Sequence, residues 1–463
     1  MSDFQNNDTV AAIATAPGEG AIAIVRLSGP ESLVIADRIF RGGARRPSRC
    51  EGGRFLYGCI RSPETDSESA GLVDEVVLLV FRAPHSYTRE DVVEIQGHGG
   101  RASARRILQA VLAAGARAAE PGEFTRRAFL GGRIDLLQAE AVADLILAKS
   151  ERAASVALEQ LQGRASDDIA ALYREILAVA ADLEASLDFD EADIAESIQA
   201  SVAERLRRAL SQLDGLLRLA REGRVLRDGA LVAIAGRPNV GKSTLLNRLL
   251  GHERAIVSDT PGTTRDTIEE TLILEGFPIR LVDTAGLRQV DCRIEQEGVG
   301  RARSLMKQAD LVLYMLDARG LHDDDRLMLE ALAESRTVVA INKTDLGCAL
   351  TATDTRPHVP VLVSLLRDEG VADMRRALLD KLNVHTGADL HALVTERHRA
   401  IFQQARNELN DAVRLAEDDG ASGHGVLIAQ HAREAMTALG RITGQTYTDD
   451  VLAEIFKRFC VGK

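Results

Sequence analysis

Apolar residues follow three different patterns along the chain. In residues 1–118 the apolar runs Ala21–Leu27, Glu75–Phe81 and Val92–Gln96 are short and separated by glycine and proline turns, which predicts strands. The segment Arg101–Ala114 has the spacing of a helix instead. This mixture predicts an α+β domain over residues 1–118.

From Pro121 onward, apolar residues recur at helical spacing. Long amphipathic helices are therefore expected over 119–223, and the pattern returns over 384–463, with a final helix after Thr448. The first of these stretches is marked by Leu130, Ile134, Leu137, Ala141, Leu145, Ile169, Leu172, Ile176, Leu183 and Leu187. The segment Asp182–Glu196 holds seven acidic residues and no basic one, which is typical of a solvated helix end.

Residues 224–383 alternate between strand-like and helix-like patterns, as a parallel doubly wound sheet requires. Helical segments flank this part on both sides. The economical interpretation is a multidomain chain in which an all-α domain, 119–223 with 384–463, is interrupted by an inserted α/β domain.

The length and composition of the chain indicate several domains and disfavour two kinds of nucleic-acid-binding protein. A chain of 463 residues is too long for one core, and 45% hydrophobic with 27% charged residues is usual for a globular protein. The net charge of −12 disfavours a generally basic RNA-coating protein. The absence of tryptophan, with 3% aromatics, argues against a stacking surface for single-stranded nucleic acid.

The cysteines and the amino terminus favour a cytoplasmic protein. Five cysteines are scattered without a Cys-x-x-Cys pair, which is typical of reduced thiols without a zinc site. The polar, acidic start of the chain is unlike a signal peptide, and no apolar run reaches the length of a membrane span. Cys460 is expected to be a packed thiol on the apolar face of the last helix, although its chemistry would also suit a nucleophile.

The strongest chemical signal is a phosphate-binding loop. Gly236-Arg-Pro-Asn-Val-Gly-Lys-Ser-Thr244 follows an apolar run and opens a helix-like segment, the setting that this motif requires. Its glycines let backbone N–H groups approach phosphate oxygens, and the helix N-terminus adds partial positive charge. We expect Lys242 to reach the β- and γ-phosphates and the Ser243 hydroxyl to bind Mg²⁺.

Three further motifs follow in the order of a guanine-nucleotide domain. Gly262-Thr-Thr-Arg-Asp266 contains Thr264, whose hydroxyl can complete Mg²⁺ coordination, and Asp283-Thr-Ala-Gly286 follows an apolar strand. Asn342-Lys-Thr-Asp345 ends another strand, and the Asp345 carboxylate can accept two hydrogen bonds that guanine offers and adenine does not. Together the four motifs predict GTP binding by a Ras-like α/β domain.

The residue that would orient water for GTP hydrolysis is harder to identify from the sequence. Ras-like enzymes place a glutamine after the Asp-x-x-Gly motif to orient water, but this chain has Leu287 there. Glu295 is our candidate for that role, and Gln289, Asp291 and Glu297 are rivals. No arginine finger can be assigned. Asn239 could instead hold a monovalent cation beside the phosphates, or simply cap the helix.

The residues of these motifs resemble those of the potassium-activated GTPases related to Era and Der. Four more segments narrow the resemblance to the MnmE (TrmE) family of tRNA uridine-modification GTPases, over essentially the whole chain. They are Gln96-Gly-His-Gly-Gly100, Pro121-Gly-Glu-Phe-Thr-Arg-Arg-Ala-Phe-Leu130, Asp135-Leu-Leu-Gln-Ala-Glu-Ala141 and Phe459-Cys-Val-Gly-Lys463.

The resemblance implies a fold and a second site for the N-terminal domain. It would bind tetrahydrofolate, like folate-dependent aminomethyltransferase domains, and mediate formation of a homodimer. The implied folate contacts are Arg26, Glu94, Arg133 and Lys463. Arg133 is more often lysine in the family, and either cation suits a carboxylate. His98 is either structural or close to the folate.

The resemblance also assigns the cation and nucleotide contacts. Potassium would be held by Asn239, Ser258, Thr260 and Thr263, and Glu295 matches the family's water-orienting glutamate. The nucleotide contacts would be Asn239, Val240, Gly241, Lys242, Ser243, Thr244, Ser258, Thr263, Thr264, Asp283, Thr284, Ala285, Gly286, Asn342, Lys343, Asp345 and Ser364. The family usually has Ser-Ala where this chain has Ser364-Leu365, which puts the shape of that loop in doubt.

The expected function is GTP-dependent modification of tRNA. With an FAD-dependent partner of the MnmG (GidA) family, in a heterotetramer or larger complex, the protein would add an aminomethyl or carboxymethylaminomethyl group to C5 of a wobble uridine. 5,10-Methylenetetrahydrofolate would supply the methylene, and 5-formyl-tetrahydrofolate would serve as its analogue. The alternatives are a ribosome-assembly GTPase of the Era/Der type and a GTP-gated scaffold without catalytic activity.

Overall fold

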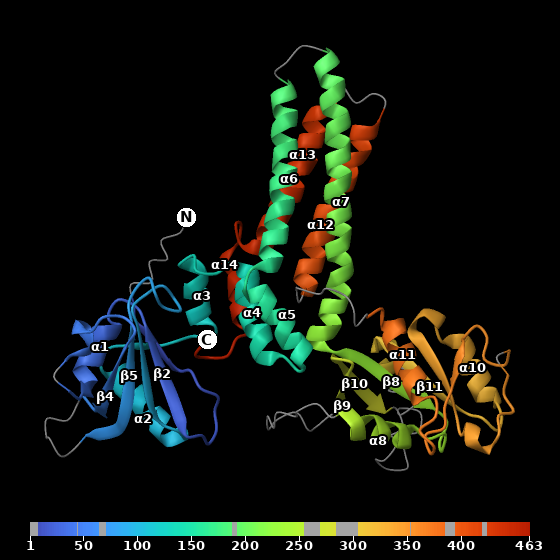
Figure 1. Ribbon diagram of the computed structural model, residues 1–463, viewed down its shortest axis with the longest axis horizontal. Coiled ribbons are helices and arrows are strands. Elements are labelled where there is room, and N and C mark those ends of the chain that lie inside the picture. Colours follow the sequence, from blue (N-terminus) through green and yellow to red (C-terminus); the bar gives the residue numbers. More distant parts are fainter. Residues whose placement is uncertain are drawn as a thin grey trace. The chain divides into compact units, whose positions relative to one another are not determined.

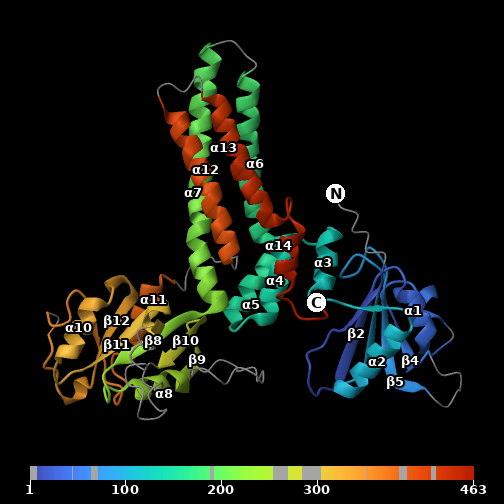
Figure 2. The same cartoon turned by 180° about the vertical axis from the view of Figure 1, so that it is seen from behind.

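The computed structural model divides the chain into two compact units. Unit 1 comprises Met1–Ala143 with Gly440–Lys463, and unit 2 comprises Asp144–Leu439 (Figures 1 and 2). The structure describes residues 8–43, 45–63, 71–187, 192–253, 269–283, 304–351, 353–384, 394–418 and 424–463. No helix within these ranges is long and apolar enough to cross a membrane.

Unit 1 is built on a seven-stranded sheet with the order β3-β4-β5-β6-β2-β1-β7. All neighbouring strands are antiparallel except β1 and β7. The strands are β1 (Val10–Ile13), β2 (Ile22–Ser28), β3 (Phe40–Arg41), β4 (Arg54–Arg61), β5 (Leu72–Phe81), β6 (Val92–His98) and β7 (Arg117–Ala118). The helical elements are α1 (Ser32–Ile39), η1 (Pro47–Arg49), α2 (Arg101–Ala113), α3 (Glu123–Leu130) and α14 (Asp449–Phe456).

Side-chain alternation gives this sheet two different faces. Val25, Val93 and Ile95 point to the face covered by α1 and α2, where they are fully buried in an apolar core. Their neighbours in sequence, Arg26 and Glu94, therefore lie on the opposite face. That face carries the polar residues discussed below.

Unit 2 combines long helices with a second sheet. The helices α6, α7, α12 and α13 lie side by side along most of their length (Figures 1 and 2). The helical elements outside the sheet region are α4 (Leu136–Leu147), α5 (Glu151–Leu161), α6 (Arg164–Leu187), α7 (Ala192–Asp228), α12 (Glu396–Glu417) and α13 (Gly425–Thr443), with α4 and α13 each crossing the boundary between the units. Apolar residues such as Leu206, Leu409 and Leu439 are buried in this region, as the helical spacing predicted.

The second sheet has six strands in the order β13-β12-β11-β8-β10-β9. All pairs are parallel except the edge pair β9–β10. The elements are β8 (Ala230–Gly236), α8 (Lys242–Glu253), β9 (Glu269–Leu274), β10 (Phe277–Asp283), β11 (Leu311–Asp317), α10 (Asp323–Ala331), η3 (Glu334–Arg336), β12 (Thr337–Asn342), η4 (Thr344–Leu346), β13 (Pro360–Leu362) and α11 (Val371–Leu382). Separate apolar cores lie on its two faces, one with α8 and α11 and the other with α10.

The predicted multidomain class, with α+β, all-α and inserted α/β parts, is confirmed. One local prediction is wrong, because α14 ends at Phe456 and Cys460 lies beyond it. Phe459 is buried, but Cys460 is exposed rather than packed on an apolar helix face. The chain leaves the helical repeat after Phe456, so Cys460 is not on a helix face.

Candidate functional site

The phosphate loop lies between β8 and α8 at the carboxyl edge of the parallel sheet. Its backbone takes left-handed conformations at Asn239 (φ 62°) and Gly241 (φ 108°). A Cβ on Gly241 would lie 2.4 Å from the Asn342 side-chain nitrogen, so the loop requires glycine there. This close approach places the loop directly against the end of β12.

Lys242, the first residue of α8, is buried with 6% of its surface exposed. Its ammonium donates hydrogen bonds of 2.7 Å to the carbonyl oxygens of Gly236 and Arg237, within its own loop. A buried ammonium needs such partners. The arrangement holds a compact positive charge beside the N-terminus of α8, which is suited to phosphate oxygens.

Asn342 connects three loops at this edge. Its side-chain nitrogen donates to the Val240 carbonyl at 2.8 Å, and its side-chain oxygen accepts from the Leu365 backbone at 3.2 Å. Leu365 is itself buried, with its side chain in the apolar core. The leucine that departs from the family pattern thus anchors its loop by packing.

Lys343 and Asp345 occupy the neighbouring positions. Lys343 donates to the Asn239 carbonyl at 2.7 Å and pairs with the Asp317 carboxylate at 2.8 Å. Hydrogen bonds from Arg319 and then from Lys343 hold the pKa of Asp317 well below its usual range. Asp345 accepts a 2.7 Å hydrogen bond from the Ser364 hydroxyl, which brings these two predicted guanine-site residues together.

Sequence reasoning missed Asp317. The residue ends β11, a strand buried along its whole length, at the same edge of the sheet as Asn342. A carboxylate directly after a buried parallel strand was the available signal.

Asp283 ends β10, which runs parallel to β8, so it lies at the same edge as the phosphate loop. Ser243 and Thr244 follow Lys242 in the first turn of α8. Eight other predicted residues of this site lie outside the described residues. They are Ser258, Thr260, Thr263, Thr264, Thr284, Ala285, Gly286 and Glu295.

A second cluster lies on the exposed face of the unit 1 sheet. Arg26 and Glu94 are direct partners across β2 and β6, and two guanidinium nitrogens of Arg26 contact one Glu94 oxygen at 2.8 Å. Both side chains are only about 15% exposed. A third nitrogen of Arg26 donates to the Gly462 carbonyl at 3.5 Å, which brings the carboxyl-terminal segment to the pair.

Lys463 completes this cluster. Burial lowers the pKa of its ammonium, and the neighbouring positive charge of Arg26 lowers it further, while Glu94 acts in the opposite direction. Gly462 (φ 99°) is required by the turn, because a Cβ there would lie 2.3 Å from the Ile13 carbonyl oxygen. Three of the four predicted folate contacts therefore meet: Arg26, Glu94 and Lys463.

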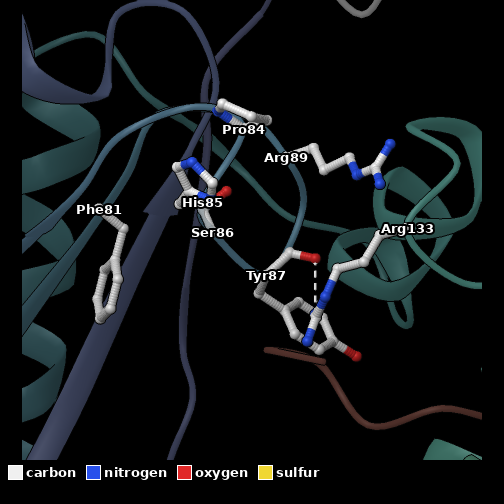
Figure 3. Close-up of a pocket in the computed structure, with 7 residues that line it drawn as sticks. All are labelled: Phe81, Pro84, His85, Ser86, Tyr87, Arg89 and Arg133. Carbon is white, nitrogen blue, oxygen red and sulfur yellow. Dashed lines mark hydrogen bonds between the residues drawn. The ribbon is translucent and has the colours of Figure 1, made fainter. Parts of the chain in front are cut away.

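The fourth, Arg133, also contacts Tyr87. The Tyr87 ring lies 5.3 Å from the Arg26 guanidinium and 4.7 Å from that of Arg133. Arg133 also donates to the Tyr87 carbonyl at 2.9 Å (Figure 3). The tyrosine hydroxyl pairs with Thr125 of α3 at 2.9 Å. No periodicity or motif in the sequence singles out Tyr87.

His98 lies apart from this cluster, at the far end of β6. It is exposed, and its ring nitrogen Nδ1 lies 2.7 Å from an Asp74 oxygen. Asp74 also accepts from the His98 backbone and from the Ser103 hydroxyl. This position favours the structural role for His98, at the start of α2.

The chain is similar in sequence to known proteins along nearly its whole length. Residues 9–133 match the family described as GTP-binding protein TrmE N-terminus, and residues 136–460 match the MnmE helical domain. The tRNA modification GTPase MnmE of Geobacter sulfurreducens is 44% identical over 98% of this chain and 99% of its own length. The chain belongs to the MnmE family. MnmE of Bacillus subtilis is 42% identical over 98% of this chain and its whole length.

These full-length matches to MnmE proteins favour the tRNA-modification class over the Era/Der ribosome-assembly alternative. Among solved structures, the FeoB G domain of T. maritima is 27% identical over 33% of this chain and 98% of its own, with a TM-score of 0.26. Aquifex aeolicus Era is 26% identical over 41% of this chain and 68% of its own, also with a TM-score of 0.26. Such scores carry no weight for the MnmE assignment, so the Ras-like domain rests on its own strand order and loop geometry.

Proposed function

We propose that this chain is a GTP-hydrolysing tRNA modification enzyme that acts with an FAD-dependent partner of the MnmG family. The product is an aminomethyl or carboxymethylaminomethyl group on C5 of a wobble uridine. The observation that carries the proposal is the full-length match to MnmE proteins. The chain accordingly holds a phosphate loop in one unit and the Arg26–Glu94–Lys463 cluster in the other.

The nucleotide part of the proposal uses the carboxyl edge of the second sheet. The Lys242 ammonium and the N–H groups of α8 bind the phosphates, and Asp345 with Ser364 recognises guanine. Ser243 and Thr264 are proposed as Mg²⁺ ligands. Asp283 supports this assignment, since it brings a carboxylate to the same sheet edge as Ser243. The metal would neutralise charge on the phosphate oxygens.

Hydrolysis is assigned to Glu295 and a potassium ion. Glu295 would orient the attacking water, the role for which Leu287 is chemically unsuited. Potassium would be held by Asn239, Ser258, Thr260 and Thr263. Of these four residues, Asn239 lies in the phosphate loop that the structure describes. Its backbone has a left-handed conformation (φ 62°), which is not the conformation of a helix residue.

The folate part of the proposal uses both charges of the second cluster. Carboxylate Glu94 suits the N–H donors of a pterin ring, and Arg26, Arg133 and Lys463 suit carboxylates. The Tyr87 ring offers an apolar surface for the ring system between them. Burial of Lys463 lowers its ammonium pKa, which makes proton transfer at this position easier than for an exposed lysine. The bound folate would supply the one-carbon unit.

The sheet of unit 1 supports the proposed homodimer. Phe55 and Tyr57 of β4 are 72% and 64% exposed, and their cross-strand partners are Leu79 and Val77. Such a contiguous apolar surface is typical of an interface. We propose that it contacts the same surface of a second copy, in a cytoplasmic complex that also holds the flavoprotein and tRNA.

The folate site provides the test of this function. Calorimetry with 5-formyl-tetrahydrofolate should detect binding to the intact chain and strong loss of affinity in a variant that lacks Cys460–Lys463. Lys463→Met, which keeps the chain length, should fall between the two. Unimpaired binding by the truncated protein would remove the carboxyl terminus from the site. No binding to the intact protein would leave a GTPase whose folate chemistry is unsupported.

A further inference from the structure

A hollow of about 470 Å³ adjoins the Arg26 cluster in unit 1. Its lining contains two arginines, a histidine and two aromatic rings but no carboxylate. The lining residues are Phe81, Pro84, His85, Ser86, Tyr87, Arg89 and Arg133 (Figure 3). The composition indicates a site for an anion attached to a flat or apolar group.

The two arginines are held in place by backbone carbonyls. Arg133 donates to the Tyr87 carbonyl at 2.9 Å, and Arg89 donates to the Gly131 carbonyl at 3.2 Å. Among the described residues, neither guanidinium forms an ion pair with a carboxylate. Each therefore keeps N–H donors and a full positive charge for a ligand.

Arg89 has a backbone conformation that favours glycine over arginine. Arg89 has a φ of 63°, a left-handed conformation that costs energy for a residue with a Cβ. Glycine would relieve that cost, so the backbone conformation does not explain an arginine at this position.

Tyr87 lines the hollow and also adjoins the proposed pterin site. Its ring lies 5.3 Å from the guanidinium of Arg26, which is paired with Glu94, and 4.7 Å from that of Arg133. The cluster at Arg26 therefore offers the Glu94 carboxylate, whereas the lining of the hollow offers two cations and no carboxylate. A folate has the complementary order, from a pterin that donates hydrogen bonds to a glutamate tail that gains one carboxylate with each added γ-linked residue.

We propose that this hollow binds the glutamate tail of the folate, with Arg133 and Arg89 contacting successive carboxylates, so that the protein prefers polyglutamylated folates. This inference rests on the proposed folate function. RNA phosphates would be the other anionic partner for exposed arginines, but Tyr87 links the hollow to the Arg26–Glu94 pair of the proposed pterin site, which favours the folate tail.

The experiment compares the mono- and triglutamate forms of 5-formyl-tetrahydrofolate by calorimetry on the full chain. The triglutamate should bind about fivefold more tightly, as expected for one or two exposed ion pairs, and the preference should shrink at high salt. Arg89→Gly fits the left-handed backbone and removes one cation, so the ratio of the two affinities should fall toward one. Arg105→Ala removes an exposed arginine from α2 in the same unit and should leave the ratio unchanged.

The outcomes separate this inference from the function on which it rests. If neither folate binds, the folate function itself fails. Equal binding of both forms, or a preference that Arg89→Gly does not reduce, would overturn the tail site while the folate function stands. A loss of tRNA affinity in Arg89→Gly, without a change in the folate ratio, would assign the hollow to RNA.

Discussion

At the scale of single residues, the phosphate loop is constrained most tightly where it touches Asn342. The Asn342 amide holds the Val240 carbonyl at 2.8 Å, and the adjacent Gly241 has no room for a side chain. The loop's shape thus depends on contact with a residue that is distant in sequence.

Gly241→Ala should lower nucleotide affinity at least about tenfold, because the new methyl would force the loop and Asn342 apart at a left-handed position. Titration with a fluorescent GDP analogue measures this. The matched control is Gly251→Ala in α8, where a Cβ would meet no atom within 4 Å and helix propensity improves. Equal affinities for the two variants would contradict the role given to the Asn342 contact.

The His98–Asp74 pair predicts a pH dependence. The hydrogen bond that the His98 ring donates to the Asp74 carboxylate raises the pKa of His98 above its usual value of 6.5. A raised pKa in the folded state means that the pair stabilises the fold fully below the unfolded pKa, and that this contribution is lost as pH rises through the folded pKa.

Asp74→Asn should return the His98 pKa toward its usual value, as an NMR titration of the His98 ring in the intact chain would measure. A His98 titration that is identical in both proteins would show that Asp74 does not set its charge.

Residues within continuous motifs were predictable from the sequence, and those joined only by the fold were not. Gly241, Lys242 and Asn342 could be assigned because each belongs to a short sequence motif that follows a predicted strand. Tyr87 and Asp317 could not be placed with equal ease, because their partners come from strands and loops far away in the chain.

At the scale of elements, α3 is tied to the unit 1 sheet by buried charges. Arg127 of α3 is almost fully buried and contacts Glu123 at 2.9 Å, Glu90 at 3.2 Å and Asp8 at 2.8 Å. The same helix supplies Thr125, which holds the Tyr87 hydroxyl. The ion network therefore holds the helix that positions Tyr87 beside Arg26 and Arg133.

Arg127→Leu should destabilise this region by about 3 kcal/mol, because it leaves the buried Glu123 carboxylate with the half-exposed Arg117 as its cationic partner. Hydrogen exchange of the α3 amides in the intact chain should accelerate about a hundredfold or more. Arg105→Leu, on an exposed part of α2, is the control and should change little. Unaltered protection of α3 in the Arg127 variant would show that the network contributes little to stability.

The element types were largely predictable, since apolar periodicity distinguishes strands from helices. The residues at which elements begin and end were harder to predict. The helix α7 continues to Asp228, past the predicted border at 223, because apolar residues such as Val225 and Leu226 pack into the core beside the second sheet. The divisions at 118, 223 and 383 stay predictions, while the chain's compact units divide at Ala143 and Gly440.

At the scale of the whole molecule, a chain of the MnmE family carries its nucleotide site and its proposed folate site in different compact units. Hydrolysis is expected to depend on a cation that the chain itself holds. GTP turnover should therefore be several-fold faster in K⁺ than in Na⁺ at equal ionic strength.

Glu295→Ala should keep GTP binding but lose most of the turnover in K⁺, since water would no longer be oriented. Glu297→Ala is a matched control that removes a neighbouring carboxylate. Equal rates in the two salts would remove the cation role of Asn239, and unchanged turnover in the Glu295 variant would pass the catalytic role to one of its rivals.

The most direct test of the account is mass spectrometry of wobble uridine in tRNA from a bacterial strain that lacks its own MnmE gene. Expression of this chain should restore the C5-aminomethyl-type modification, and expression of the Lys242→Ala variant at the same level should not. Continued absence of the modification, with the intact chain present and hydrolysing GTP, would contradict its function in tRNA modification.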